Sequence, residues 1–179
     1  MDNKWIVGVK PQYNMTPDEA LNAFINNTQP FNTPQIKRIA DTYKVILRNA
    51  FLMEKECESL IQVPHLETKT LASLHVLKET FVVSQEMSRF QETCFCFING
   101  FITVADLDSE VVSIAANVLA MGYIAHFATK GMATSFEDTD YGHELFAVSA
   151  QRIDALSDDL TMALSRVSLI AVLCGITPN

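Results

Sequence analysis

Eight residues recur at alternating intervals of three and four between positions 36 and 60 of this chain. They are Ile36, Ile39, Tyr43, Ile46, Ala50, Met53, Cys57 and Leu60. Heptad spacing of this kind places all of them on one stripe of a long α-helix. Ala40, Leu47 and Phe51 widen the stripe, and Pro64 is expected to end the helix. Since such a stripe has to be covered by other helices, it predicts a helical bundle.

Two further segments carry the same pattern. In the region 66–103, Leu71, Leu74, Leu77 and Phe81 lead into a seam made of Val83, Met87, Phe90, Cys94, Phe97 and Phe101. The last element, from about Asp140 to Gly175, carries Phe146, Ile153, Leu156, Leu160, Ala163, Val167, Ile170 and Cys174. Ser157 is a candidate cap for a separate last helix, but the unbroken seam favours one helix.

Helix starts are marked near the N-terminus. Thr16 before Pro17 and Thr33 before Pro34 each place a capping hydroxyl ahead of a proline at the first helical position. They predict a short helix over about 17–26 and the start of a long one at 34. Residues 1–15 are expected to form an N-terminal arm that holds a short strand or a packed apolar strap.

A fourth helix is predicted from Asp108 or Ser109 to about residue 129, with Gly131 as its terminator. No charge lies between Glu110 and Lys130, so 19 consecutive residues are uncharged. That length is enough to cross a bilayer. Polar residues within the run, and the absence of flanking basic clusters, favour instead a helix buried in the middle of the assembly. We therefore predict no membrane association.

Together these segments predict an all-α fold. Only 6 glycines and 6 prolines are present among 179 residues, fewer than a fold rich in turns requires. The expected architecture is a single-domain antiparallel helical bundle over residues 16–179, with four long helices and a short N-terminal one.

The segment "ETCFCFINGF", residues 92–101, raises the question of a thiol or metal site. In a helix Cys94 and Cys96 point in directions about 200° apart, so they do not chelate one ion by themselves. In a strand both would share a face. Because the helical spacing continues through Cys94, we interpret it as a core residue.

Charge narrows the classes of partner. The net charge is −8, and residues 131–179 carry seven acidic and two basic side chains. Nucleic-acid binding requires clustered Lys and Arg, which the sequence lacks. A basic protein partner suits this balance. The four cysteines form no disulfide framework and no leader is recognisable, so a cytoplasmic setting is expected.

The most polar segment is "SFEDTDYGHELF", residues 135–146. Its acids Glu137, Asp138, Asp140 and Glu144 are the candidate partner-binding residues. Neither an EF-hand loop nor a two-histidine zinc motif fits this segment. The alternative is that these acids only favour the N-terminus of the following helix.

A small-molecule or metal site in the bundle core, with or without catalysis, is the second hypothesis. His75, His126 and Cys94 would be its polar contacts, in a pocket lined by phenylalanine and methionine. No phosphate-binding loop, serine-nucleophile motif or di-iron motif is present. We therefore predict no cofactor, no metal and no catalysis.

The favoured function is protein binding, as an adaptor, a chaperone or an immunity-type inhibitor of a basic partner. Three heptad seams expose more apolar surface than one chain needs to build a core. This excess of apolar surface is also consistent with self-association into a homodimer.

Overall fold

The computed structural model describes residues 13–81, 83–134 and 140–165. These residues are all-helical, and none of them lies in a strand. They form the helices α1 (Pro17–Ile25), α2 (Pro34–Ile61), α3 (Thr68–Thr80), α4 (Val83–Ile98), α5 (Val104–Thr134) and α6 (Asp140–Leu164). The predicted arm at 1–15 and the end of the last seam, from Val167 to Cys174, lie almost wholly outside the described residues.

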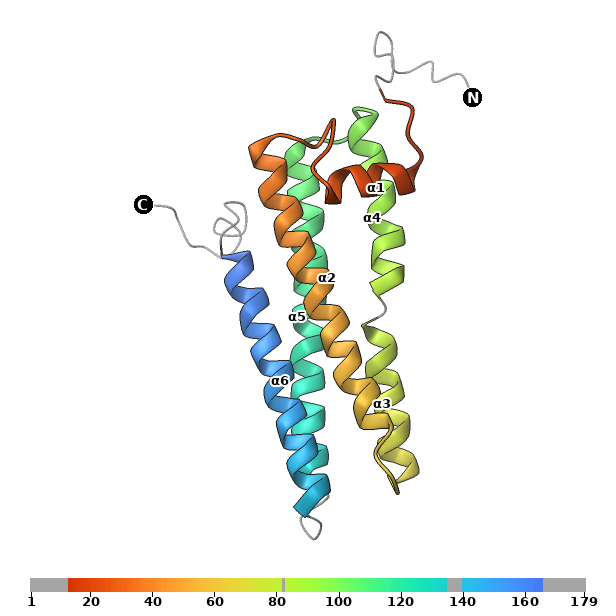
Figure 1. The fold of residues 1–179 in the computed structure, drawn as a ribbon, viewed down its shortest axis with the longest axis vertical. Coiled ribbons are helices and arrows are strands. Elements are labelled where there is room, and N and C mark those ends of the chain that lie inside the picture. The colour runs from red at the N-terminus through yellow and green to blue at the C-terminus, as the bar shows by residue number, and fades with distance from the viewer. Residues whose placement is uncertain (1–12, 82, 135–139, 166–179) are drawn as a thin grey trace.

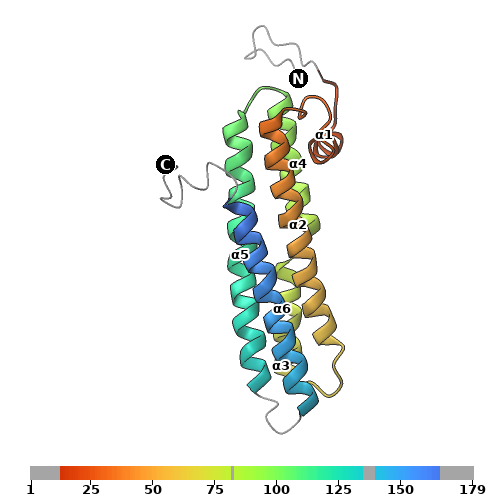
Figure 2. The same ribbon diagram turned by 60° about the vertical axis from the view of Figure 1, so that its left-hand side comes forward.

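The long helices run side by side as a bundle. Figure 1 shows α2 descending, α3 and α4 following one another back up, α5 descending and α6 rising again. α5 packs most extensively on α6 and also contacts α2, α4 and α3, while α1 crosses α4. Turned by 60°, α5 forms the edge of the bundle farthest from α1 (Figure 2).

The predicted helix starts near the N-terminus are confirmed. The Thr16 hydroxyl accepts from the backbone N–H of Glu19, and the Glu19 carboxylate accepts from the N–H of Thr16 at 2.9 Å. This reciprocal pair satisfies two backbone donors that the helix itself leaves free. At α2 the Thr33 hydroxyl makes a single cap, accepting from the N–H of Ile36 at 3.2 Å.

α2 buries its heptad seam as predicted. All eight seam residues from Ile36 to Leu60 are buried. Phe51 is the exception on the widened stripe, since its side chain is 47% exposed. It lies beyond the edge of the buried face and packs instead under the ammonium of Lys55, at 5.3 Å from the ring centre.

The third predicted long helix is wrong as a single element, because the chain breaks between α3 and α4. Phe81 closes α3 in a turn and is buried at 3% exposure. Its side chain lines a small gap between α2 and α5. The spacing of Leu74, Leu77 and Phe81 agrees with the burial of this ring, but it does not predict that the helix breaks there.

α4 ends in a Schellman motif at Gly100, whose φ is +76°. The Phe101 N–H donates to the Cys96 carbonyl at 3.0 Å and the Gly100 N–H donates to the Phe97 carbonyl. The helical period therefore stops before Phe101, which is 43% exposed. The prediction that Phe101 belongs to the core seam is wrong for this reason.

An aromatic cluster fills the end of the bundle where α1 crosses. The Phe90 ring lies 4.4 Å from that of Tyr43 and 5.1 Å from that of Phe24, measured between ring centres. Phe31, from the loop after α1, stacks on Phe97 at 5.2 Å. Edge-on and offset contacts of this kind stabilise beyond the area they bury. The cluster attaches α1 and its loop to α2 and α4.

α5 is longer than predicted at both ends. It begins at Val104 instead of near Asp108, because the Asp106 carboxylate accepts from both the N–H and the hydroxyl of Thr103, at 2.7 and 2.9 Å. It also runs through Gly131 to Thr134, so Gly131 is not a terminator. Asp108 therefore lies within the helix and is buried.

α6 is one continuous helix across its described length. Ser157, predicted as an alternative cap, lies inside it, is 1% exposed and donates to the Ile153 carbonyl. The inner residues Phe146, Ile153 and Leu160 are fully buried. The seam thus continues through the candidate break.

Candidate functional site

The most unusual surface of the described molecule is the outer side of α5. We define the outer face of α5 as its exposed residues Glu110, Ser113, Ala116, Asn117, Ala120, Tyr123, Ile124, Phe127, Lys130 and Gly131. Tyr123, Ile124 and Phe127 are 47%, 52% and 66% exposed. Large apolar side chains gathered on one face often mark an interaction site.

The opposite side of α5 packs against the bundle, so the outer face points to solvent. Val111, Ile114, Ala115, Val118 and Ala125 are buried against the rest of the bundle. The prediction of a helix buried all round is therefore wrong, since α5 is covered on one side only. A core helix needs covering neighbours on every side, and among the described residues the outer face has none.

Gly122 sets how closely α5 approaches its neighbours. A methyl group built there would lie 2.7 Å from the Ser157 hydroxyl and 3.1 Å from the terminal carbon of Met53. At that separation a methyl group would force the Ser157 or Met53 side chain to move. Gly122 thus allows the inner side of α5 to pack closely against α6 and α2.

Two grooves flank the outer face. Between α3 and α5 lies an open groove of about 720 Å³, lined by Val76, Leu77, Ala128, Gly131 and Met132 among others. Val76 is 62% exposed beside it. Between α4 and α5 lies a second groove of about 320 Å³, with Arg89 and Glu92 on one wall and Ser113 and Asn117 on the other.

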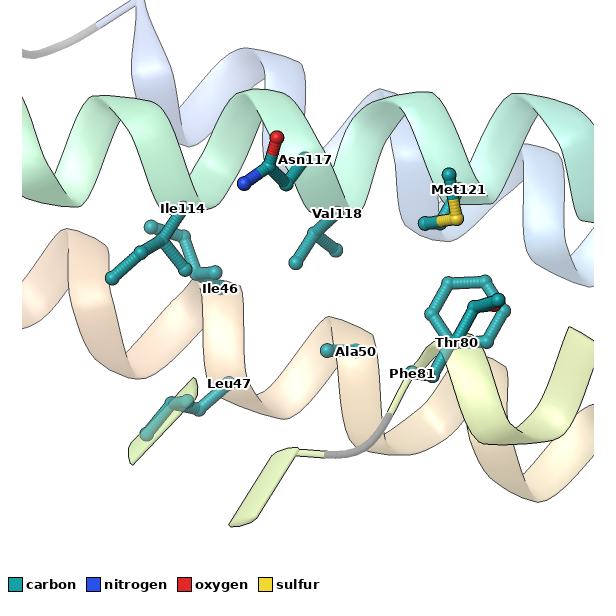
Figure 3. A pocket seen from close by; sticks show the side chains of 9 residues that line it. All are labelled: Ile46, Leu47, Ala50, Thr80, Phe81, Ile114, Asn117, Val118 and Met121. Carbon is teal, nitrogen blue, oxygen red and sulfur yellow. The ribbon is translucent and has the colours of Figure 1, made fainter. Parts of the chain in front are cut away.

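A third space lies under α5, where the chain breaks between α3 and α4. Figure 3 shows its walls, which come from α2, α5 and the break, with Phe81 and Met121 at one end and Ile46 and Ile114 at the other. Its volume is about 40 Å³. Ligand pockets usually measure about 300–1,000 Å³, so this space is a packing defect, not a ligand site.

The predicted acidic site falls partly outside the described residues. Glu137 and Asp138 lie there, so the structure does not place them. Asp140 is the first residue of α6, and Glu144 is exposed on its first turns. Their grouping as a partner-binding surface stays a prediction.

The residues of the alternative ligand site lie on three helices, in different surroundings. His75 is exposed on α3. His126, on α5, is half-buried with its Nδ1 atom 2.8 Å from the Ala150 carbonyl of α6. Cys94 is fully buried in the main core on α4. Within the described ranges no three His, Cys, Asp or Glu residues are grouped closely enough to hold a metal ion.

The positions of Cys94 and Cys96 bear on whether the Cys-x-Cys sequence forms a thiol or metal site. Both lie on a helix, with Cys94 in the core and Cys96 half-buried on another side. Burial raises the pKa of the Cys94 thiol, and burial with nearby Glu92 raises that of Cys96. Burial with Glu56 and Glu54 raises the pKa of Cys57 to about 11. A raised thiol pKa disfavours the thiolate, which is the form that acts as a nucleophile or a metal ligand.

The outer face of α5 was missed from sequence, although its signal is visible there. Glu110, Ser113, Asn117, Ala120, Ile124, Phe127 and Gly131 are themselves spaced by three and four. The same run satisfies the length and composition of a membrane-spanning helix, a property that core helices share. A helix with an apolar stripe on two sides indicates two packing partners.

Comparison of the chain with models of protein families, with curated proteins and with solved structures finds no match. Functional inference therefore depends on the geometry of the molecule.

Proposed function

We propose that this protein acts by binding another protein chain through the outer face of α5, and not by catalysing a reaction. The observation that carries the proposal is the joint exposure of Tyr123, Ile124 and Phe127 on successive turns of one helix. Removing apolar surface from water contributes about 25 cal/mol per Å². Aromatic residues are also enriched among those that dominate binding energy in protein interfaces.

The proposal includes the architecture that presents this face. In it, residues 16–179 form one domain of four antiparallel rods, and α3 and α4 together make one rod. α5 then lies at an edge of the bundle, with a rigid inner side and an open outer one. Sites on packed helices hold their geometry better than sites on loops.

Charge forms the second part of the proposal, with an acidic surface in the C-terminal third that selects a basic partner. Glu144, Asp158 and Asp159 are exposed along α6. Arg152, a basic residue of the same helix, lies 3.4 Å from Glu56 of α2. Complementary charge mainly raises association rates and specificity.

Photo-crosslinking in the cells that make the protein tests the first part. A photoreactive amino acid is placed at Ile124 of the full chain, with Arg48, exposed on α2, as the matched control position. We expect a defined adduct from position 124 that is absent from position 48. Mass spectrometry identifies the captured chain. If neither Ile124 nor Phe127 captures any protein, the proposal fails.

Titration of that captured chain, once purified, gives the quantitative result. Phe127→Ser is expected to weaken binding about tenfold or more, as truncation of a central aromatic does. Reversing Asp138, Asp140 and Glu144 to lysine tests the acidic part. Unchanged binding after that reversal would remove the acidic surface from the proposal and leave the α5 contact standing.

A further inference from the structure

We propose that the partner of the outer face of α5 is a basic amphipathic helix of another protein, which lies along the side that α5 shares with α6. This inference rests on the proposed function, because it names the chemistry of the partner and the side of α5 that the partner covers. We define the α5–α6 surface by Ala120, Tyr123 and Phe127 of α5 and by Asp154 and Asp158 of α6. It sets aromatic rings beside carboxylates.

The closest approach of α5 and α6 fixes where the neighbouring side chains point. A methyl group built on Gly122 would lie 2.7 Å from the Ser157 hydroxyl, so these two residues face each other across the pair. Tyr123 and Asp158 are the next residues of each helix, and each is turned by about 100° from that contact. Because one helix descends while the other rises (Figures 1 and 2), both turns lead to the same side of the pair.

Two residues of each helix, one turn apart, carry the chemistry of the α5–α6 surface. On α5 they are Tyr123 and Phe127, which are 47% and 66% exposed. On α6 they are Asp154, half-buried, and Asp158, exposed. Since the helices are antiparallel neighbours, the rings and the carboxylates adjoin in a strip about 10 Å long, at ~1.5 Å per residue. Ala120, near Asp158, is small and leaves room there for a long side chain of the partner.

The carboxylates on this side of α6 differ from the charged residues on its other side, which contact α2. Arg152 pairs with a glutamate of α2 at 3.4 Å, and Asp159 accepts from the Asn49 amide of α2 at 3.2 Å. Within the described ranges, no basic side chain pairs with Asp154 or Asp158. Two such carboxylates one turn apart favour a partner with basic residues at the same spacing.

Aromatic rings beside carboxylates suit the side chains of arginine and lysine. Their apolar stems cover a ring while the cationic end reaches a carboxylate. A partner arginine that stacks on Tyr123 is within reach of Asp154, and a second arginine one turn along its helix meets Asp158. An amphipathic helix also carries apolar residues beside such a basic stripe, and these cover Phe127. The expected partner helix is therefore basic along one stripe and apolar along the next.

Fluorescence anisotropy with two labelled synthetic helical peptides and the full chain tests this chemistry. The first peptide carries a leucine stripe and, beside it, arginines one turn apart. The second has glutamate in place of every arginine. We expect the first to bind with a Kd on the order of 10 μM and the second at least tenfold more weakly. Equal affinities, or no binding of the arginine peptide up to about 1 mM, would overturn the proposal.

Charge reversal at matched positions locates the bound peptide. Asp158→Lys is expected to weaken binding of the arginine peptide about tenfold, and Phe127→Ser by a similar factor. Glu110→Lys is the control, because it changes the net charge equally but lies on the opposite rim of α5, beside α4. It should change the affinity by less than about twofold. Circular dichroism verifies that each variant folds. Equal losses from Asp158→Lys and Glu110→Lys would mean attraction by net charge alone, and the proposal would be wrong.

Three outcomes separate this inference from the function it rests on. A protein captured at position 124 that binds the Asp158→Lys variant unchanged overturns the inference and leaves the proposed function intact. A dimer of the full chain in sedimentation velocity that Asp158→Lys dissociates names a second copy as the occupant, which also overturns the foreign helix. A chain that captures no protein at position 124 or 127, and binds neither peptide, overturns both.

Discussion

α2 and α5 are long helices of similar size, 28 and 31 residues, yet their outer sides differ in character. The outer side of α2 carries ion pairs, with Lys37 Nζ at 2.8 Å from Asp41 and Lys55 Nζ at 2.6 Å from Glu58. The outer side of α5 presents Tyr123, Ile124 and Phe127 to solvent. In α2 the apolar seam lies opposite a charged face, so the sequence indicates which side of the helix is buried. α5 carries apolar residues on both sides, and the bundle covers only one of them.

The sharpest test of this comparison replaces one isoleucine in each helix. Ile46 of α2 is fully buried and Ile124 of α5 is 52% exposed. We expect Ile46→Ala to lower the free energy of unfolding by about 2–5 kcal/mol. Ile124→Ala should change it by less than about 0.5 kcal/mol. Urea denaturation of the monomeric chain measures both, and equal losses would show that the outer face of α5 is covered within the monomer.

The inner side of α5 gives the next largest effect. Gly122→Ala adds a methyl group against Ser157 and Met53, and it should destabilise the fold by about 1–3 kcal/mol. Gly131→Ala is the matched control, because a methyl group there meets nothing within 4 Å. It should stabilise the helix by up to about 1 kcal/mol. Effects of the same sign at the two glycines would contradict the close packing of α5 on α6.

A buried carboxylate makes α5 sensitive to pH. Asp108 is 8% exposed, its Oδ1 atom has no hydrogen-bond partner within the described part of the chain, and burial raises its pKa. The folded protein therefore binds this proton more tightly than the unfolded chain, and the ionised form opposes folding at neutral pH.

Asp108→Asn should therefore raise the free energy of unfolding by about 1 kcal/mol at pH 7, and the gain should vanish as the pH falls below the ordinary carboxyl value. Denaturation curves across this pH range measure it. Asp106 is the control with the opposite sign. Its hydrogen bonds from Thr103 lower its pKa, so Asp106→Asn should lose stability above that pH. A gain from both replacements would contradict the capping role of Asp106.

The charged outer side of α2 should give the smallest effect. A double-mutant cycle of Lys37→Ala and Asp41→Ala is expected to yield a coupling of about 0.3–0.5 kcal/mol, which salt reduces. The hydrogen bond from Lys37 also lowers the pKa of the Asp41 carboxyl, as a favourable ion pair should. A coupling above about 1 kcal/mol would show that this surface contributes more than solubility.

Much of the fold followed from local sequence, for identifiable reasons. The caps at Thr16 and Thr33 and the seam from Ile36 to Leu60 depend on hydrogen bonds and spacing within one segment. The start of α5 was misplaced because the acid near it, Asp106, reaches back to Thr103 as an acceptor. Reading Asp108 as a cap treated a buried residue as an exposed one.

The candidate site was less accessible from sequence. The acidic residues near α6 could be recognised from the amino-acid composition of that segment. Whether they form one surface depends on their positions in space, which composition does not give. The outer face of α5 was hidden inside an uncharged run that suits a buried helix, a membrane helix and an interface helix equally. Its exposure is decided by where α6, α2, α3 and α4 lie around it.

What the sequence by itself determined is the helical nature of the chain, its caps and the buried side of α2, since these depend on neighbours three or four residues apart. Tertiary structure alone decided the break between α3 and α4 and which side of α5 is covered. Phe81 is buried at the break, and Gly122 brings one side of α5 against α6 and α2. Both are contacts between residues far apart in the chain, so no local spacing records them.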